Sequence, residues 1–290
     1  MDDSSLISLV EIGTRFNCDK FTRHHFGAAY ERHFCQLRHE PLRILEIGIG
    51  GEDFEDGGTS LKTWEEYFHQ ALVFGIDIYD KSFLNTARIK TMVCDQGNQE
   101  QLIQLSAEHG PFDIIIDDGS HINIKTLQSL FALFQCLKPG GLYIVEDVQT
   151  AYWPQYGGSS LMGGFKETTM TWLKTMMDCV NAAEILWPNH PALRSGFSVE
   201  ELHAYHNITF LKKAVQPAVS AVLTEELRRE WLRIDMVQHA SNESTADLLN
   251  NHPSLLSAMA NFVASLEQAQ QARISDGGSP SPDPSTLGHG

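Results

Sequence analysis

The sequence has 290 residues, of which 42% are hydrophobic and 20% are charged, a composition that suits one large globular domain with a sizeable core. Its formal net charge of -16 argues against nucleic acid or an anionic membrane as the main partner, because both bind basic surfaces. The five cysteines show no CxxC spacing, which argues against a disulfide framework or a zinc site and predicts a reducing cytoplasm as the location.

The first part of the chain, residues 1–40, is predicted to form a helical cap or lid segment. Its acidic and polar beginning predicts no secretory signal, and we expect no membrane span because no apolar run is long enough. Apolar residues in Ser5–Phe16 recur at helical spacing, and Leu6, Leu9 and Val10 are expected on one face. Polar and aromatic residues follow: Asp19, Lys20, His24, His25 and Tyr30. A packed cap explains the aromatics, whereas the polar group fits a cap or a functional cluster.

Strand and helix patterns then alternate through the middle of the chain. Strands are predicted at Arg43–Gly50, Ala71–Asp80, Arg88–Gln96, Phe112–Ile116 and Gly141–Val145. Helices are predicted at Leu61–Gln70, with Trp64, Tyr67 and Phe68 on its buried side, and at Gln99–His109, Thr126–Leu137 and Thr168–Ala183, with a turn at Lys138–Gly141. This alternation predicts an α/β fold, a Rossmann-like and mostly parallel sheet of seven strands.

The C-terminal part is predicted to complete this sheet with an antiparallel hairpin at Leu202–Ala214, broken at Asn207. Helical patterns follow at Glu225–Val237 and Ser254–Arg273. We place the main domain at residues 41–274. The tail, residues 275–290, is rich in Gly, Ser and Pro and is predicted to be disordered.

Two predicted strands end in acidic residues. FDIIIDDGSH (Phe112–His121) contains Asp118, and GGLYIVED ends in Glu146 and Asp147. Neighbouring parallel strands end at the same edge of a sheet, so these three carboxylates are expected to converge and to hold a hard divalent cation such as Mg²⁺. Adjacent strand residues point to opposite faces, so both acids of the pair can bind one ion only if the chain turns at Asp147.

A glycine-rich loop after the first predicted strand indicates a nucleotide pocket. Glu46, Gly48 and Gly50 resemble the start of a dinucleotide fingerprint, but Asp53 stands where the third glycine belongs, and the acidic surroundings disfavour a phosphate. S-adenosylmethionine, a cation without phosphates, suits this loop better, although an ordinary tight turn also explains the glycines. Asp77 is expected to bind ribose hydroxyls, and Asp95 with Gln96 the adenine edge; either alone also fits a solvated strand end.

Several stretches resemble class I S-adenosylmethionine-dependent methyltransferases, and more narrowly the macrocin and mycinamicin sugar O-methyltransferases of macrolide tailoring. The resemblance runs from about Gly13 to Gly158 and rests on GTRFNCDK, ILEIGIGG, VFGIDIYDKS, DIIIDDGSH and LKPGGLYIVEDVQTAYWP. It implies Mg²⁺ bound by Asp118, Glu146 and Asp147, a general base at His121, and a cofactor pocket lined by Glu46, Gly48, Asp77 and Asp95. It also implies that the N-terminal segment and the loop after Asp147 close over the substrate. We add Gly50, Ser60, Gln96 and Asp117 to the predicted cofactor residues.

The resulting hypothesis is an S-adenosylmethionine- and Mg²⁺-dependent O-methyltransferase of antibiotic biosynthesis. Its acceptor is a hydroxyl of a secondary metabolite, a deoxysugar or a polyketide, which the metal binds and His121 deprotonates. The alternatives are a metal-independent methyltransferase of this fold, a methyltransferase domain within a polyketide synthase, and a non-enzymatic nucleotide-binding module. Tyr152, Trp153 and Tyr156 stack on the acceptor or pack under a surface loop. The oligomeric state stays open, a homo-oligomer included.

Overall fold

The computed structural model describes residues 7–51, 57–161 and 167–241. The chain divides into two compact units, residues 1–222 and 223–290. The second unit contributes helix α9 (Glu225–Ser241), where a helix was predicted. The predicted helix Ser254–Arg273 and the tail from residue 275 lie outside the described residues, and the boundaries predicted at residues 40 and 274 stay predictions. No helix in the described ranges is both long and apolar enough for a membrane span.

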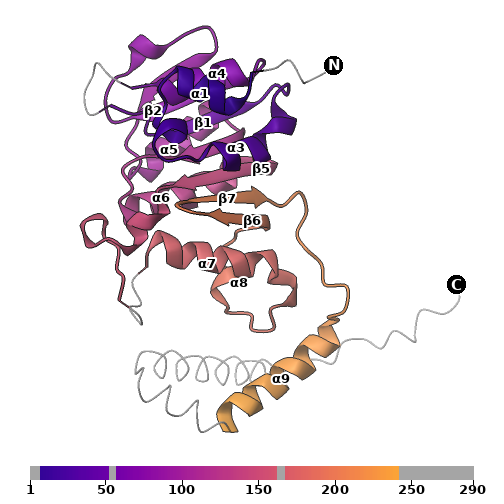
Figure 1. The fold of residues 1–290 in the computed structure, drawn as a ribbon. Helices are drawn as coiled ribbons and strands as arrows, with labels where there is room; N and C mark the ends of the chain where they lie inside the picture. Colours follow the sequence, from indigo (N-terminus) through magenta and orange to yellow (C-terminus); the bar gives the residue numbers. More distant parts are fainter. Residues whose placement is uncertain (1–6, 52–56, 162–166, 242–290) are drawn as a thin grey trace, which may run out of the picture. The chain divides into compact units, whose positions relative to one another are not determined.

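The first unit is built on a seven-stranded sheet with the strand order β3-β2-β1-β4-β5-β7-β6 (Figure 1). The strands are β1 (Arg43–Ile47), β2 (Leu72–Asp77), β3 (Ile89–Val93), β4 (Phe112–Asp117), β5 (Leu137–Glu146), β6 (Val199–Tyr205) and β7 (Ile208–Lys213). The first five run parallel, and β7 runs antiparallel to both β5 and β6. Asn207 turns the hairpin with a φ of 64°. The predicted sheet and the predicted hairpin are therefore confirmed.

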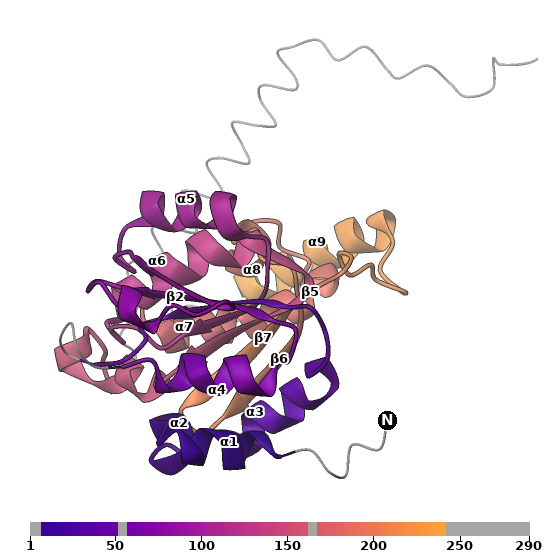
Figure 2. The same cartoon turned by 90° about the horizontal axis from the view of Figure 1, so that it is seen from above.

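Helices cover both faces of this sheet (Figure 2). One face carries α1 (Leu9–Arg15), α2 (Asp19–Thr22), α3 (Gly27–Phe34) and α4 (Thr59–Tyr67). The other carries α5 (Gln99–His109), α6 (Asn123–Leu133), α7 (Thr169–Val180) and α8 (Pro191–Arg194). Each face has its own buried apolar cluster, as a two-sided parallel sheet requires.

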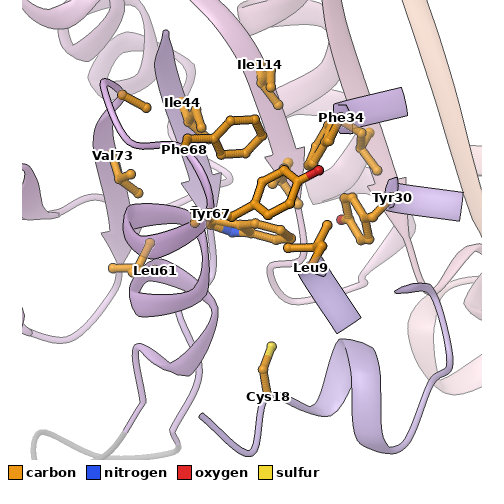
Figure 3. Close-up of a cluster of buried hydrophobic side chains, with 14 of the residues drawn as sticks. Leu9, Cys18, Tyr30, Phe34, Ile44, Leu61, Tyr67, Phe68, Val73 and Ile114 are labelled. Atoms are coloured by element: carbon orange, nitrogen blue, oxygen red, sulfur yellow. The ribbon is translucent and has the colours of Figure 1, made fainter. Parts of the chain in front are cut away.

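Aromatic rings hold the N-terminal helices on the sheet (Figure 3). Trp64, Tyr67 and Phe68 are fully buried, as predicted, and the rings of Tyr30 and Trp64 lie 5.1 Å apart between centroids. Gly13 allows this packing, because a Cβ atom there would lie 2.1 Å from the Phe21 ring. The segment Leu9–Phe34, which we call the cap, is thereby fixed to the face that carries β1.

Two sequence predictions differ from the structure. Val10 is 41% exposed, because α1 begins at Leu9 behind the Ser8 cap and buries Ile12 instead. The helix predicted to end at Leu137 ends at Leu133, and Lys138–Gly141 belongs to β5 rather than to a turn. Leu137 pairs with Phe112 before the register shifts toward Ile114, so the glycines lie in an irregular start of the strand.

Candidate functional site

A cavity of about 530 Å³ opens where β1, β2, β4 and β5 reach their carboxyl ends. Pairing aligns these ends, since Ile47 lies opposite both Ile76 and Asp117, and Asp117 lies opposite Val145. The loops after the strands therefore meet around one space, as expected for open parallel sheets. Its lining includes nine predicted site residues that follow or end strands: Gly48, Gly50, Asp77, Asp95, Gln96, Asp118, His121, Glu146 and Asp147.

Gly48 brings two of these loops into direct contact. Its φ is +75°, and a Cβ atom there would lie 2.4 Å from the carbonyl oxygen of Asp118. The amide of Asp118 in turn donates to the carbonyl of Ile47 at 3.0 Å. A glycine at position 48 therefore allows the loops after β1 and β4 to approach closely. Gly50, with a φ of +76°, also lines the cavity.

Asp77 and Asp95 lie on the β2 and β3 side of the cavity. Asp77 accepts hydrogen bonds from the amides of Tyr79 at 3.0 Å and Ile49 at 3.3 Å, which ties the end of β2 to the glycine loop. Asp95 accepts from the amide of Gly97 and the ammonium of Lys125, and these bonds lower the pKa of its carboxyl. Both side chains are held in place by these hydrogen bonds, as hydroxyl or amine recognition requires.

Glu46 and Ser60 lie behind this cavity rather than along it. Glu46 is fully buried, and its Oε2 accepts from Ser60 Oγ at 2.8 Å and from Trp64 Nε1 at 3.1 Å. Burial raises the pKa of Glu46, and the nearby Lys20 ammonium opposes this rise. Neither residue is among those that line the cavity. Their predicted contact with a cofactor stays a prediction.

Asp117 also lies away from the cavity, unlike the sequence prediction. Its carboxylate accepts from Gln96 Nε2 at 2.6 Å, from Ser129 Oγ and from Tyr143 Oη at 3.1 Å. Burial raises the pKa of Asp117 to about 7. Side chains alternate along β4, so Asp117 points to the face of α6 and Asp118 to the face of the cap. Gln96 lines the cavity, but its side-chain amide donates to Asp117 and accepts from the backbone amide of Ser120.

Asp118, His121 and Asp147 form a compact group with ligand atoms within 4.8 Å of one another. His121 Nε2 lies 3.9 Å from Asp118 Oδ1 and 3.4 Å from Asp147 Oδ2. The chain turns at Asp147, whose φ is 50°, so the turn that the sequence argument required is present. The two carboxylates at this spacing, with the imidazole beside them, fit a divalent cation such as Mg²⁺ or Mn²⁺, which prefer carboxylate oxygen.

Glu146 reaches the same edge but belongs to a different set of contacts. Only 4% of it is exposed, and its Oε1 accepts from Tyr30 Oη and lies 2.9 Å from Lys20 Nζ. Burial, followed by repulsion from Asp118, raises the pKa of Glu146. It lines the cavity without joining the group of three, which leaves Asp118 and Asp147 as the carboxylates that face a shared cation position.

Lys20 belongs to the polar group noted in the cap, but the sequence analysis assigned it no role at this site. The residue is 1% exposed, and its ammonium contacts Asp118, Glu46 and Glu146. Burial alone would lower the pKa of Lys20, but the three carboxylates hold it well above the usual value. Its position in the motif GTRFNCDK could have marked Lys20 as a site residue. No local sequence pattern, however, identifies its partners, which are far away along the chain.

His24 approaches the site from the cap as well. Its Nδ1 lies 3.7 Å from Asp147 Oδ1, and its ring stacks on Phe26 with centroids 5.4 Å apart. Asp147 thus lies between His24 and His121. The neighbouring loop, η5 (Val148–Tyr152) and η6 (Pro154–Tyr156), leaves Tyr152 42% and Trp153 44% exposed. His24 lines the cavity, whereas Tyr152 and Trp153 are not among the residues that line it.

No protein-family model matches this chain. Among curated proteins it is 43% identical over 212 residues to demethylmacrocin O-methyltransferase of Streptomyces fradiae, a match that covers 71% of this chain and 53% of that protein. It is 40% identical over 210 residues to mycinamicin VI 2''-O-methyltransferase of Micromonospora griseorubida, covering 71% and 52%. The chain thus spans about half the length of the curated relatives it matches.

A solved structure supports the same relation. The MycE methyltransferase from the mycinamycin biosynthetic pathway, in complex with Mg, SAH and mycinamycin VI, superimposes with a TM-score of 0.68 at 36% identity and covers 76% of this chain and 58% of that one. A second crystal form with Mg and SAH gives a TM-score of 0.70 at 37% identity, covering 78% and 60%.

Proposed function

Because the chain has the class I methyltransferase fold and is related in sequence to macrolide-sugar O-methyltransferases, we propose that it is an S-adenosylmethionine- and Mg²⁺-dependent O-methyltransferase. The observation that carries the proposal is the group Asp118, His121 and Asp147, which lies on the same cavity as the glycine loop and Asp77. In this proposal, the nucleoside position holds the methyl donor, and the cation position in the same cavity activates the acceptor hydroxyl beside it.

The cofactor side of the cavity is proposed to hold S-adenosylmethionine through Gly48, Gly50, Asp77 and Asp95. The carboxylate of Asp77 is oriented by two backbone amides, so its remaining acceptor positions can receive the ribose hydroxyls. Asp95, fixed by Lys125, suits the adenine edge. Four further predicted residues are proposed to support this pocket through hydrogen bonds to one another and to neighbouring helices: Glu46, Ser60, Gln96 and Asp117.

The acceptor side is proposed to hold Mg²⁺ through Asp118 and Asp147, with Glu146 behind them. When bound there, the cation lowers the pKa of the acceptor hydroxyl. His121 then takes the proton on Nε2, and the acceptor oxygen displaces S-adenosylhomocysteine at the methyl carbon. The Asp147 carboxylate beside His121 Nε2 stabilises the imidazolium that this transfer creates.

The acceptor is proposed to be a hydroxyl of a glycosylated or polyketide natural product, in keeping with the relatives' names. The exposed rings of Tyr152 and Trp153, in the loop that follows Asp147, offer a stacking surface for a sugar or a macrocycle. The protein would then act in antibiotic biosynthesis, inside the cell, on small molecules. The chain matches only about half of the length of each of these relatives, so activity and substrate have to be tested on this chain itself.

The test is product mass spectrometry with deuterated S-adenosylmethionine, Mg²⁺ and a panel of glycosylated macrolides with their aglycones. We expect a labelled methyl group on a sugar hydroxyl, loss of transfer after chelation with EDTA, and recovery when Mg²⁺ is restored. Transfer that survives chelation would favour a metal-independent methyltransferase. Tight cofactor binding without transfer to any acceptor would favour a nucleotide-binding module and reject the proposed activity.

A further inference from the structure

A buried lysine lies among the acidic side chains at the carboxyl edge of the sheet. Lys20, on α2 of the cap, has 1% of its surface exposed. Its Nζ contacts Asp118 Oδ2 and lies 2.9 Å from Glu146 Oε1 and 3.2 Å from Glu46 Oε1. An ammonium group has three donors and meets three carboxylates here, each from a different strand or strand end. The cap therefore delivers one fixed positive charge to the edge where the cation is proposed to bind.

We propose that Lys20 is a positioning residue that competes with the divalent cation for Asp118 and Glu146, so that the cap sets the affinity of the cation site. This inference rests on the proposed function, since it concerns the same edge. Lys20 acts through the carboxylates it contacts and has no assigned contact with the acceptor.

The competition follows from the charges on the cap-facing side of the sheet. Asp118 uses one oxygen for Lys20, while its other oxygen, Oδ1, faces His121. Glu146 Oε1 contacts both Lys20 and Tyr30 of the cap, and Glu146 is not part of the group of three. A positive charge beside two carboxylates weakens their attraction for a second cation, and burial makes this effect larger than it would be in water. Removing the ammonium should therefore strengthen cation binding.

The variant must remove the charge without leaving a buried carboxylate alone. Lys20→Met keeps the apolar stem but leaves Glu46 without its cation, a change that destabilises a fully buried acid. The double variant Lys20→Met/Glu46→Gln is therefore compared with Glu46→Gln, so that the two differ only in the ammonium, and the glutamine in both can still accept from Ser60 and Trp64. Circular dichroism and thermal unfolding verify that it folds, and Lys20→Met alone is measured beside it.

Two matched controls separate charge from other effects. Lys125→Met removes a positive charge from the same cavity, but from the side of Asp95, where Lys125 Nζ lies 3.0 Å from Asp95 Oδ1. Tyr30→Phe removes the second cap contact to Glu146 without a change of charge. If Lys20 acts by charge at the cation position, neither control should reproduce the effect of Lys20→Met/Glu46→Gln.

The measurement is Mn²⁺ binding, followed by the electron paramagnetic resonance signal of the free ion, with no acceptor present. We expect the dissociation constant of Lys20→Met/Glu46→Gln to lie roughly tenfold or more below that of Glu46→Gln, while Lys125→Met and Tyr30→Phe stay within about threefold of the unaltered protein. Binding in the folded double variant that is no tighter than in Glu46→Gln, or an equal gain in Tyr30→Phe, overturns the inference. If the unaltered protein binds no Mn²⁺, this result counts against the proposed function. If binding then appears only in the double variant, the competition by Lys20 is still supported. If neither protein binds Mn²⁺, the proposed function and the competition are both rejected.

Discussion

His121 Nε2 lies 3.4 Å from Asp147 Oδ2, and both residues hold left-handed backbone conformations, with φ values of 56° and 50°. Such conformations cost non-glycine residues about 1–2 kcal/mol, and they persist where the surrounding structure requires them. Here they turn the chain after β4 and after β5, so that a histidine and a carboxylate from two strands face each other. The backbone conformation itself therefore sets the facing arrangement of these two side chains.

The first prediction concerns His121. We expect His121→Ala to lower kcat by about 100-fold to 10,000-fold, because a positioned base contributes that much, while the dissociation constant of S-adenosylhomocysteine stays within about twofold. Turnover measured by product mass spectrometry and binding measured by calorimetry give the two values. His206→Ala, in the β6–β7 turn, is the control and should leave both unchanged. An unaffected rate in His121→Ala would remove the base from the mechanism.

The second prediction concerns the cation. Asp118→Asn should weaken Mn²⁺ binding by roughly tenfold or more and abolish stimulation of turnover by Mg²⁺, because a carboxylate ligand to a divalent cation is lost. Asp113→Asn is the control, since Asp113 also lies on β4 but pairs with Lys138 at the opposite end of the strand. Equal Mn²⁺ affinity in the two variants would place the ion elsewhere.

The third prediction concerns the cofactor pocket. Asp77→Asn should raise the dissociation constant of S-adenosylhomocysteine by roughly 10-fold to 100-fold, because hydrogen bonds to a charged acceptor contribute about 1.5–3 kcal/mol each. Asp80→Asn, an exposed acid on the same loop that accepts from the amide of Ser82, should bind like the unaltered protein. Calorimetric titration compares the two, and matching affinities would exclude the ribose role.

The fourth prediction is a pH dependence of stability. Burial raises the pKa of Asp117 to about 7 in the folded protein, whereas an unfolded chain has an aspartate pKa of about 3.9. The folded state therefore binds more protons between these values, so this stabilisation is complete below about pH 3.9 and is lost as the pH rises through about 7. The free energy of unfolding is measured with urea at about pH 5 and about pH 8, with EDTA present. Between these pH values, the unaltered protein should lose about 1 kcal/mol or more of this free energy relative to Asp117→Asn. Parallel pH profiles would contradict this.

The fifth prediction concerns the acceptor. Trp153→Ala should raise KM for the glycosylated acceptor by roughly tenfold, because stacking on a large ring is lost, and should leave cofactor affinity unchanged. Trp187→Ala is the matched control, because Trp187 is 40% exposed where Trp153 is 44% exposed, but it lies between α7 and α8 rather than in the loop after Asp147. An equal KM for the two variants would indicate that the loop after Asp147 does not receive the acceptor.

The sheet and its acidic edge could be predicted from sequence because their signals are local. Short apolar runs ending in glycine or acid placed Asp77, Asp118 and Asp147 at strand ends, and the structure brings them to one cavity. Alternation along β4 could also have assigned Asp117 and Asp118 to opposite faces. That rule, applied strictly, would have kept Asp117 out of the predicted pocket.

The contribution of the cap could not be predicted in the same way. Lys20 and Tyr30 meet Glu146 only after the cap has packed on the sheet, and no spacing within Leu9–Phe34 encodes that meeting. The same applies to Glu46, whose partners Ser60 and Trp64 come from α4. Tertiary packing, rather than the pattern of any one segment, decides which acids face the cavity.

The most direct test asks whether a divalent cation binds beside the methyl donor. In this experiment, the relaxation rate of the ¹³C-labelled methyl group of S-adenosylmethionine is measured by nuclear magnetic resonance as Mn²⁺ is added to the protein. The account predicts a strong increase in that rate, which is lost in Asp118→Asn and retained in Asp113→Asn. Bound cofactor whose methyl group relaxes equally with and without Mn²⁺ would contradict it.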